Sequence, residues 1–467
     1  MADKKQNPNL KIVIGGPEVS FETETSADCP IISGEGEKKW LEYLQIIDQG
    51  EVPSKEMLDR WKTYGSDLPD LKPAYLKEDY PQLKNRIVYF ETSRGCPYLC
   101  SFCLSALDKT VRYFDDEIIF NQMENLINSG VKKFKFVDRT FNLKPGRMKT
   151  LMEWLSQFIG SEFHFEVVGD ILTPDILRFL ETVPPGMFQF EIGIQTTDES
   201  VQESIDRKQN NQKLFDTIKT LLVQDRIHFH CDLIFGLPGE NMGKILNSFR
   251  EVLSLRPHEL QLGFLKFLPG APIKNTIRSH KYQYQSTPPY ELISNKDLSA
   301  EEVDYLKKFA DIFDRFYNSK RFRFSIVHLL QKMDPVTLFD RLLHHHESNN
   351  LFMNPVALDT QYEIFQQTFF TNPSSEEKDL LKLDYLYSQR AYRLPAFLSE
   401  KSIFSGKTWK QDRKTPIISF QHKIEISGSK AHLKSMEHPV YYAISHSNNG
   451  SGYFHRPILN RIEEPRI

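Results

Sequence analysis

The segment RGCPYLCSFC (residues 94–103) holds three of the five cysteines in this 467-residue chain. It directly follows IVYFETS (87–93), an apolar run that predicts a buried β-strand. Cys96, Cys100 and Cys103 are therefore expected at the carboxyl end of a strand, where parallel α/β folds place their chemistry. Thiols at this density indicate a site for a metal ion or a metal cluster.

The number of cysteines favours an iron–sulfur cluster over structural zinc. Structural zinc takes four protein ligands, usually as two closely spaced pairs, and the remaining Cys29 and Cys231 do not form a second pair. Nor does a nearby histidine stand at ligand spacing. Three thiolates on a [4Fe–4S] cluster leave one iron open, so that a substrate or cofactor can bind there. Zinc and a coincidental grouping are the alternatives.

Short apolar runs alternate with amphipathic segments downstream of residue 87. Strands are expected at 87–93, 133–138, 164–169, 188–194, 228–236 and 259–267, with helices such as 118–130 and 244–255 between them. Six strand–helix alternations predict a parallel sheet, either open or curved into an incomplete barrel. From about residue 300 the pattern becomes mainly helical, with some strand expected after residue 400.

Composition and charge exclude several classes of partner. The net charge of −3 offers no global positive field for nucleic acid. The first residues, MADKKQNPNLKIV, lack the apolar core of a signal peptide. No run approaches the roughly 20 apolar residues of a membrane span, so no membrane partner is expected. Few cysteines, three of them bunched, predict a reduced cytoplasmic protein.

The motif CPYLCSFC after a strand resembles the CxxxCxxC signature of the radical S-adenosylmethionine (SAM) superfamily. The resemblance implies an α/β fold with a partial (β/α)6 barrel. It implies a [4Fe–4S] cluster on Cys96, Cys100 and Cys103, with SAM bound to the open iron. Reductive cleavage of SAM would then give methionine and a 5′-deoxyadenosyl radical. An external reductant such as flavodoxin or ferredoxin is implied as a partner.

Later segments resemble the SAM-binding motifs of this superfamily. Phe102 is similar to the aromatic residue that packs against adenine, or alternatively covers the cluster. Asp138, in KFKFVDRTFN (133–142), stands where the methionine amino group is bound, with a strand-end cap as the alternative. In FQFEIGIQTTDES (188–200), Gln195 resembles the ribose ligand, whereas Glu191 is ambiguous. Arg207 resembles the residue that reaches the SAM carboxylate, although a salt bridge to adjacent acids is nearly as good an explanation.

Two further segments complete the resemblance. CDLIFGLPGE (231–240) is similar to the fifth-strand motif in which Ile234 and the backbone at Gly236 approach adenine. LKFLPGAPI (265–273) is similar to the segment that closes over the adenine ring. Cys231, on the fifth strand, is expected to be a buried structural thiol rather than a radical quencher.

The first fifty residues resemble part of a second domain. KIVIGGPEVSF (11–21) and PIISGEGEKKWLEYL (30–44) are similar to the last two strand–helix units of the doubly wound cobalamin-binding domain found in B12-dependent radical SAM proteins. The loops that would line the cobalamin tail contain Gly15, Gly16, Gly34, Glu35 and Gly36. Ordinary tight turns are the alternative. A complete domain has about a hundred further residues, so a fragment or misassigned start is expected, over a separate subunit or lost cobalamin binding.

These resemblances divide the chain into four parts. They are a cobalamin-domain remnant (1–50), a proline-rich linker (51–86), a barrel core (87–275) and a mainly helical extension of unknown role (276–467). KDLLKLDYLYSQRAYRLPAFL (378–398) resembles the uncharacterised C-terminal domain of one subgroup. The three consecutive histidines 344–346 do not share a helix face, so no metal site is expected there.

The expected activity is B12-dependent C-methylation of an unactivated carbon in an unknown substrate. Alternatives are a cobalamin-independent radical rearrangement or oxidation, including a coproporphyrinogen-oxidase-like role, and a non-catalytic iron–sulfur protein. A methylthiotransferase would need three more N-terminal cysteines, and only Cys29 precedes the cluster motif. A non-catalytic protein would require a fourth protein ligand. No catalytic residue is assigned from the sequence.

Overall fold

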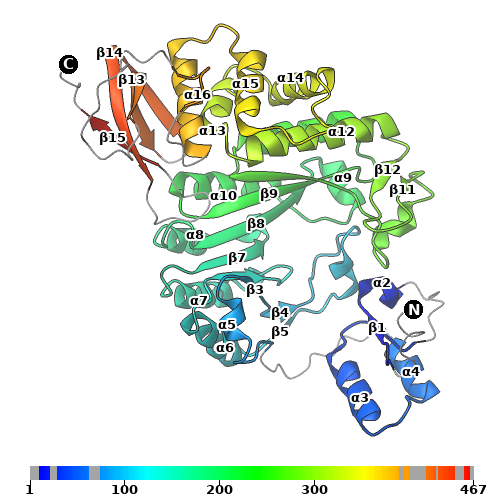
Figure 1. The fold of residues 1–467 in the computed structure, drawn as a ribbon. Coiled ribbons are helices and arrows are strands. Elements are labelled where there is room, and N and C mark those ends of the chain that lie inside the picture. The colour runs from blue at the N-terminus through cyan, green and yellow to red at the C-terminus, as the bar shows by residue number, and fades with distance from the viewer. Residues whose placement is uncertain are drawn as a thin grey trace.

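The computed structural model describes residues 10–21, 29–62, 74–388, 394–399, 417–427, 430–446 and 457–462. Within these ranges the centre of the molecule is a six-stranded sheet (Figure 1). The strands are β3 (Ile87–Phe90), β6 (Lys133–Phe136), β7 (Glu162–Val167), β8 (Phe188–Gln195), β9 (His228–Phe235) and β10 (Glu259–Phe264). All neighbouring pairs are parallel and the strands lie in chain order.

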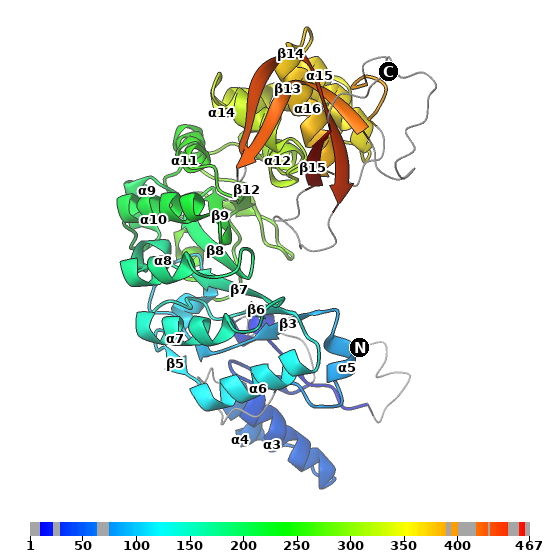
Figure 2. The same cartoon turned by 90° about the vertical axis from the view of Figure 1, so that its left-hand side faces the viewer.

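Helices connect the strands and cover one face of this sheet. The connections contain α6 (Asp116–Asn128), α7 (Pro145–Leu155), α8 (Pro174–Leu180), α9 (Glu199–Ser204), α10 (Asn211–Gln224) and α11 (Met242–Ser254). Figure 2 shows α6, α7, α8 and α10 side by side along the same side of the strands. Side chains at the N-caps, such as Asp115 and Asn210, accept hydrogen bonds from the first helical amides. Strands in chain order with helices on one face form the predicted incomplete barrel.

The two faces of the sheet differ in chemistry because strand side chains alternate. The outward face is apolar and fully buried: Phe134, Phe136, Phe163, Phe165, Phe188, Phe190, Phe229 and Cys231. These side chains and those of the covering helices belong to one hydrophobic core, and the burial of Cys231 matches a structural thiol. The inward face carries the half-buried Lys135, His164, Glu166, Glu191, His230 and Asp232. A polar inner face of this kind is suited to bind a ligand rather than to fill a core.

The N-terminal residues form a small separate unit. Parallel strands β1 (Ile14–Gly15) and β2 (Ile31–Ile32) pack with α2 (Pro17–Phe21), α3 (Glu37–Asp48) and α4 (Lys55–Lys62). Helix α4 lies within the expected linker, and the linker prediction is wrong for these residues. The reason is burial, because Trp61 is completely inaccessible in a cluster with Ile32, Tyr43 and Ile46.

The C-terminal region packs on the barrel and is mainly helical. It contains the hairpin β11 (Gln283–Tyr284) and β12 (Leu292–Ser294), helices α12 (Ala300–Phe313), α13 (Arg323–Leu329), α14 (Pro335–Ser348), α15 (Leu358–Phe369) and α16 (Ser375–Ser388). An antiparallel sheet of β13 (Ile417–Ser427), β14 (Lys430–His446) and β15 (Pro457–Ile462) follows. Phe249 of α11 contacts the rings of Phe309, Phe313 and Phe339, which joins this region to the barrel core. In the described ranges no helix combines the length and apolarity needed to cross a membrane.

Candidate functional site

The three clustered cysteines lie on a loop that the rest of the barrel holds in place. Strand β4 (Ser93–Arg94) pairs with β5 (Arg112–Tyr113) and closes this loop. At its start Gly95 has a φ of 91°, and a Cβ there would stand 2.2 Å from the Thr110 carbonyl oxygen. In the middle, the Ser101 amide donates to the Ile205 carbonyl at 2.9 Å, and the Ser101 carbonyl accepts from the Ile273 amide at 2.7 Å. Backbone hydrogen bonds to two distant segments therefore fix the loop.

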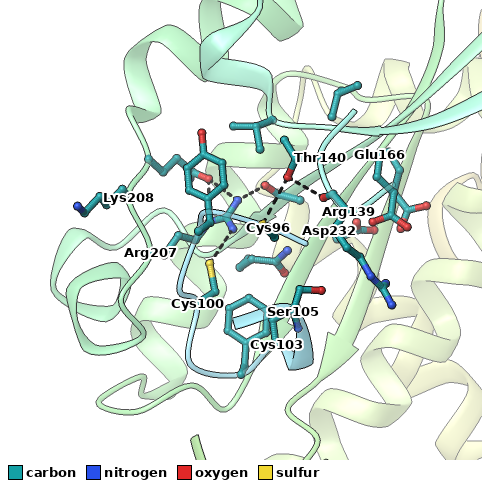
Figure 3. A pocket seen from close by; sticks show the side chains of 18 residues that line it. Cys96, Cys100, Cys103, Ser105, Arg139, Thr140, Glu166, Arg207, Lys208 and Asp232 are labelled. Carbon is teal, nitrogen blue, oxygen red and sulfur yellow. Dashed lines mark hydrogen bonds between the residues drawn. The ribbon is translucent and has the colours of Figure 1, made fainter. Parts of the chain in front are cut away.

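Cys96, Cys100 and Cys103 all line one cavity at the carboxyl ends of β7, β8 and β9 (Figure 3). The cavity has a volume of about 180 Å³, several times the space that one water occupies. All three residues are free thiols. Burial raises the pKa of Cys100, and the nearby Arg207 guanidinium opposes that shift. A metal or cluster that binds these sulfurs must displace their protons.

The donor set around this cavity fits a cluster with three protein ligands. Among the described residues that line it, no fourth cysteine and no histidine accompanies the three thiols. Structural zinc sites use four cysteine and histidine ligands, and the residues that line the cavity do not provide that set. Three thiolates with an adjoining polar cavity match a [4Fe–4S] cluster with one iron accessible to a second ligand.

Two of the residues expected to contact SAM line the same cavity with their polar atoms. Gln195 adopts a φ of 69° where the β8–β9 register shifts, and its Oε1 is buried without a hydrogen-bond partner. Arg207 donates to the Gly193 carbonyl, to Gln209 Oε1 at 3.0 Å and towards Cys100 Sγ at 3.7 Å. These contacts are not the salt bridge to adjacent acids that was the alternative. The unpaired oxygen of Gln195 is free to accept a hydrogen bond from a ligand hydroxyl.

Phe102 also lines the cavity, next to the third cysteine. Its ring is only partly buried and packs against the edge of the main core. Its two expected roles, adenine contact and cover for the cluster, are both compatible with this position.

Asp138 is placed differently from the expectation. Its carboxylate is almost fully buried and does not line the cavity. Oδ1 accepts from the hydroxyls of Thr92 and Ser93, both at 2.6 Å, and Oδ2 accepts from the Thr92 amide at 3.0 Å. Both oxygens are thus committed to the end of β3. The geometry favours the alternative of a strand-end cap over contact with an amino group.

Ile234 and Gly236 stand on and just after β9 but are not cavity-lining residues. Gly236 has a φ of 88°, and a Cβ on it would lie 2.0 Å from Leu292 Cδ2. The local turn and the close packing of the β12 hairpin account for this glycine. The fully buried Glu240 accepts hydrogen bonds from the amides of Gly236 and Leu237, at 3.0 and 3.2 Å.

Sequence reasoning missed several polar residues of the cavity: Tyr98, Arg139, Thr140, Glu166, Lys208 and Asp232. Figure 3 shows Glu166 and Asp232 near Arg139, with Arg207 and Lys208 on the other side. Burial raises the pKa of both carboxyl groups to about 7, and the charge of Glu191 adds to the effect. Oδ1 of Asp232 is buried without a hydrogen-bond partner. For Glu166 and Asp232 the sequence did contain a signal, namely an acidic residue at an inward-facing position of an otherwise apolar strand.

Glu191, whose role the sequence leaves ambiguous, is one of the residues that line the cavity. Its Oε2 lies 3.1 Å from His164 Nε2, 3.4 Å from His230 Nε2 and 3.2 Å from Lys135 Nζ. Hydrogen bonds from the two histidines lower the pKa of Glu191 and keep it ionised. The cavity is therefore bordered by an ionised carboxylate that Lys135 and the two histidines contact.

The N-terminal glycines lie at the carboxyl ends of β1 and β2. Gly16 and Gly34 have φ values of 101° and 72°, and nothing lies within 4 Å of a Cβ built on Gly16. Gly15 and Gly36 flank them in the same two loops. Glu35 accepts both guanidinium donors of Arg112, at 2.9 and 2.6 Å, so this unit is tied to the cysteine loop. Cobalamin binding by these loops stays a prediction.

Two family models match parts of this chain. Residues 90–252 match the Radical SAM superfamily, and residues 278–438 match a family described as protein of unknown function, DUF4080. The cobalamin-dependent radical SAM methyltransferase TokK of Streptomyces tokunonensis is 25% identical over 345 residues, which cover 64% of this chain and 49% of TokK. The 2-(S-pantetheinyl)-carbapenam-3-carboxylate methyltransferase of Streptantibioticus cattleyicolor is 23% identical over 348 residues, 64% and 50% of the two chains.

The chain thus spans about half the length of these two curated relatives. Among solved structures, the cobalamin-dependent SAM radical enzyme OxsB matches 82% of this chain and 63% of its own. The TM-score is 0.50 at 13% identity, so this match supports the fold alone.

Proposed function

We propose that this protein is an enzyme that cleaves SAM at a [4Fe–4S] cluster held by Cys96, Cys100 and Cys103, since residues 90–252 match the Radical SAM superfamily. The cluster, when reduced, supplies the electron that converts SAM to methionine and a 5′-deoxyadenosyl radical. The observation that carries the proposal is the cavity itself, lined by three thiols and, among its described residues, by no fourth sulfur or imidazole ligand. A non-catalytic cluster protein would want that fourth ligand.

The charged residues of the cavity suit a ligand that carries charges of both signs. Three cations (Arg139, Arg207 and Lys208) and three acids (Glu166, Glu191 and Asp232) line it. SAM bears a carboxylate, an ammonium group and a sulfonium. Buried carboxylates are stabilised by an opposite charge within a few ångströms, so binding SAM would lower the pKa values of Glu166 and Asp232 from about 7.

The individual roles follow from donor and acceptor chemistry. Arg207 would donate to the SAM carboxylate, since it already reaches Cys100 and stays rigid through Gln209. The unpaired oxygens of Gln195 and Asp232 would accept from the ribose hydroxyls. Glu166 would bind the ammonium group in place of Asp138, whose carboxylate is already satisfied.

We also propose that the reaction is a B12-dependent methylation of carbon in a substrate of unknown identity. The support is the activity of relatives such as the methyltransferase TokK and the position of the glycine loops beside the cysteine loop, to which Glu35 and Arg112 join them. Cobalamin-independent rearrangement or oxidation is the second candidate. A flavodoxin or ferredoxin would deliver the electron, and free thiols suit a reducing cytoplasm.

The test is anaerobic turnover of the reconstituted full chain. The protein is loaded with iron and sulfide, then mixed with SAM and dithionite, with and without methylcobalamin. We expect 5′-deoxyadenosine in mass spectra, absent from the Cys96→Ala/Cys100→Ala/Cys103→Ala variant. S-adenosylhomocysteine that appears only with cobalamin supports methylation. A fully iron-loaded protein that yields no deoxyadenosine refutes the radical SAM assignment.

A matched pair of variants tests the SAM carboxylate contact. Arg207→Lys keeps the positive charge but loses the planar set of donors, so the SAM concentration at half-maximal rate should rise about tenfold. Arg178→Lys, on the exposed surface of α8, serves as the control and should leave the SAM concentration at half-maximal rate unchanged. Equal values for all three proteins would remove Arg207 from the SAM site.

A further inference from the structure

Three potential metal ligands converge on the inner face of the barrel. His164, Glu191 and His230 come from the neighbouring strands β7, β8 and β9. Glu191 stands directly opposite His230 in the β8–β9 register, and His164 is two residues before Glu166, the β7 partner of Glu191. Since residues two apart share a face of a strand, parallel pairing brings these three side chains together.

The two distances from Glu191 to the histidines fall in the range found between ligands of one metal ion. Metal–ligand distances near 2.05 Å for imidazole and carboxylate put two ligands about 2.9 Å apart at 90° and about 3.4 Å apart at the tetrahedral angle. Glu191 Oε2 lies 3.1 Å from His164 Nε2 and 3.4 Å from His230 Nε2. All three ligand atoms lie within 4.8 Å of one another. One ion between them needs only small side-chain adjustments.

The three side chains are accessible to an ion. His164, Glu191 and His230 expose 19%, 24% and 19% of their side-chain surface. Glu191 also lines the cavity that the cysteines border. An ion held by this trio would border the cavity through Glu191, since neither histidine lines it. Coordination positions not filled by protein would stay open, as in catalytic rather than structural sites.

Another histidine–carboxylate pair on the same sheet shows what is special about this trio. His228 Nε2 lies 3.3 Å from Glu259 Oε1, but the ammonium group of Lys320 also contacts that carboxylate. This pair offers one imidazole only, and a lysine already neutralises its acid. The position serves as an internal control.

Lys135 is the feature that opposes a metal ion. Its Nζ lies 3.2 Å from the same Glu191 oxygen and supplies positive charge to it. The Lys135 side chain is 32% exposed, so it has room to move away when an ion arrives. Metal and lysine therefore compete for Glu191, which predicts that removing the lysine charge tightens metal binding.

We propose that His164, Glu191 and His230 bind one divalent transition metal ion, of the zinc or iron(II) class, with open positions beside the cavity. Two imidazoles and one carboxylate are the ligand set that such ions prefer. The ion would serve as a Lewis acid for an oxygen group of a bound molecule. The site is separate from the cysteine cluster and does not depend on SAM cleavage.

The experiment counts zinc on the full chain. Cluster-loaded protein is equilibrated with Zn²⁺ over a concentration series, separated from free metal and analysed for zinc and iron by mass spectrometry. We expect one zinc per chain, and at least tenfold weaker binding in each of His164→Ala, Glu191→Ala and His230→Ala. His228→Ala should bind as the parent does, and Lys135→Met more tightly.

A second measurement separates this site from the thiols and from misfolding. The Cys96→Ala/Cys100→Ala/Cys103→Ala variant should still bind Co²⁺, with visible d–d absorption and without a thiolate charge-transfer band. The proposal is wrong if the parent binds no zinc. It is also wrong if the cysteine variant loses the metal while the histidine variants keep it. Neither result bears on deoxyadenosine formation, so the proposed function stands or falls separately.

Discussion

Glu240 makes the stability of the barrel depend on pH. Its carboxylate is 1% exposed and holds the turn after β9 through the amides of Gly236 and Leu237. Burial raises the pKa of Glu240 to about 8, from an ordinary value of 4.5. The folded protein therefore binds this proton more tightly than the unfolded chain does, and the perturbation we choose is Glu240→Gln.

The sign and size of the change in unfolding free energy with pH follow from proton linkage. A raised folded-state pKa gives a stabilising contribution that is complete below pH 4.5 and is lost as the pH rises through 8. Integration between the two pKa values leaves about 2.7 kcal/mol at pH 6 and about 0.1 kcal/mol at pH 9. The glutamine variant has no proton to lose, and its side-chain oxygen can still accept from both amides. Between pH 6 and pH 9 it should therefore gain roughly 2.6 kcal/mol relative to the parent.

The assay is urea unfolding followed by far-ultraviolet circular dichroism, for both proteins at pH 6 and pH 9. The quantity compared is the difference in unfolding free energy between the two proteins, since all other titrations cancel in it. Glu251→Gln, at an exposed position of α11, is the control and should track the parent. If the difference in unfolding free energy between Glu240→Gln and the parent changes by less than about 0.5 kcal/mol from pH 6 to pH 9, the raised pKa of Glu240 does not contribute to stability as argued.

Three further substitutions test backbone and capping geometry. Gly95→Ala should cost more than about 3 kcal/mol, since it combines a positive φ with a Cβ 2.2 Å from the Thr110 carbonyl oxygen. Gly160→Ala has a similar φ but open space, so only about 1 kcal/mol should be lost in the same denaturation assay; equal losses would show that the contact is unimportant. Asp384→Asn should lower the unfolding free energy by about 1–3 kcal/mol. Its two oxygens accept from the first amides of α13, including Ser325 at 2.9 Å, and an amide nitrogen cannot; an unchanged melting temperature would contradict this.

Local pattern was sufficient for the strands of the barrel and for the grouping of the three thiols. Strand and helix periods differ, so alternating apolar runs located all six barrel strands near residues 87–267. The CxxxCxxC spacing brings Cys96, Cys100 and Cys103 onto one short loop regardless of the rest of the fold. Both features are encoded by residues close together in the chain, so they can be predicted without knowing the register between strands.

Other features depended on which residues meet across the fold. Asp138 was expected to bind a ligand, but its burial beneath Thr92 and Ser93 uses both of its oxygens. Helix α4 belongs to the N-terminal unit and not to a linker, because burial of the large apolar ring of Trp61 in that unit is favourable.

The cavity acids and the two histidines beside Glu191 show most clearly that contacts across the fold cannot be read from the sequence. Glu166 and Asp232 lie on the two strands that flank the strand of Glu191. The residues next to each acid in the chain do not indicate that the three lie close together. The residues that alternate toward the inner face of each strand can be read from the chain's own pattern. Which of them share a layer depends on the folded structure, because the register between parallel strands is set by the long helical connections and the packing of the whole sheet.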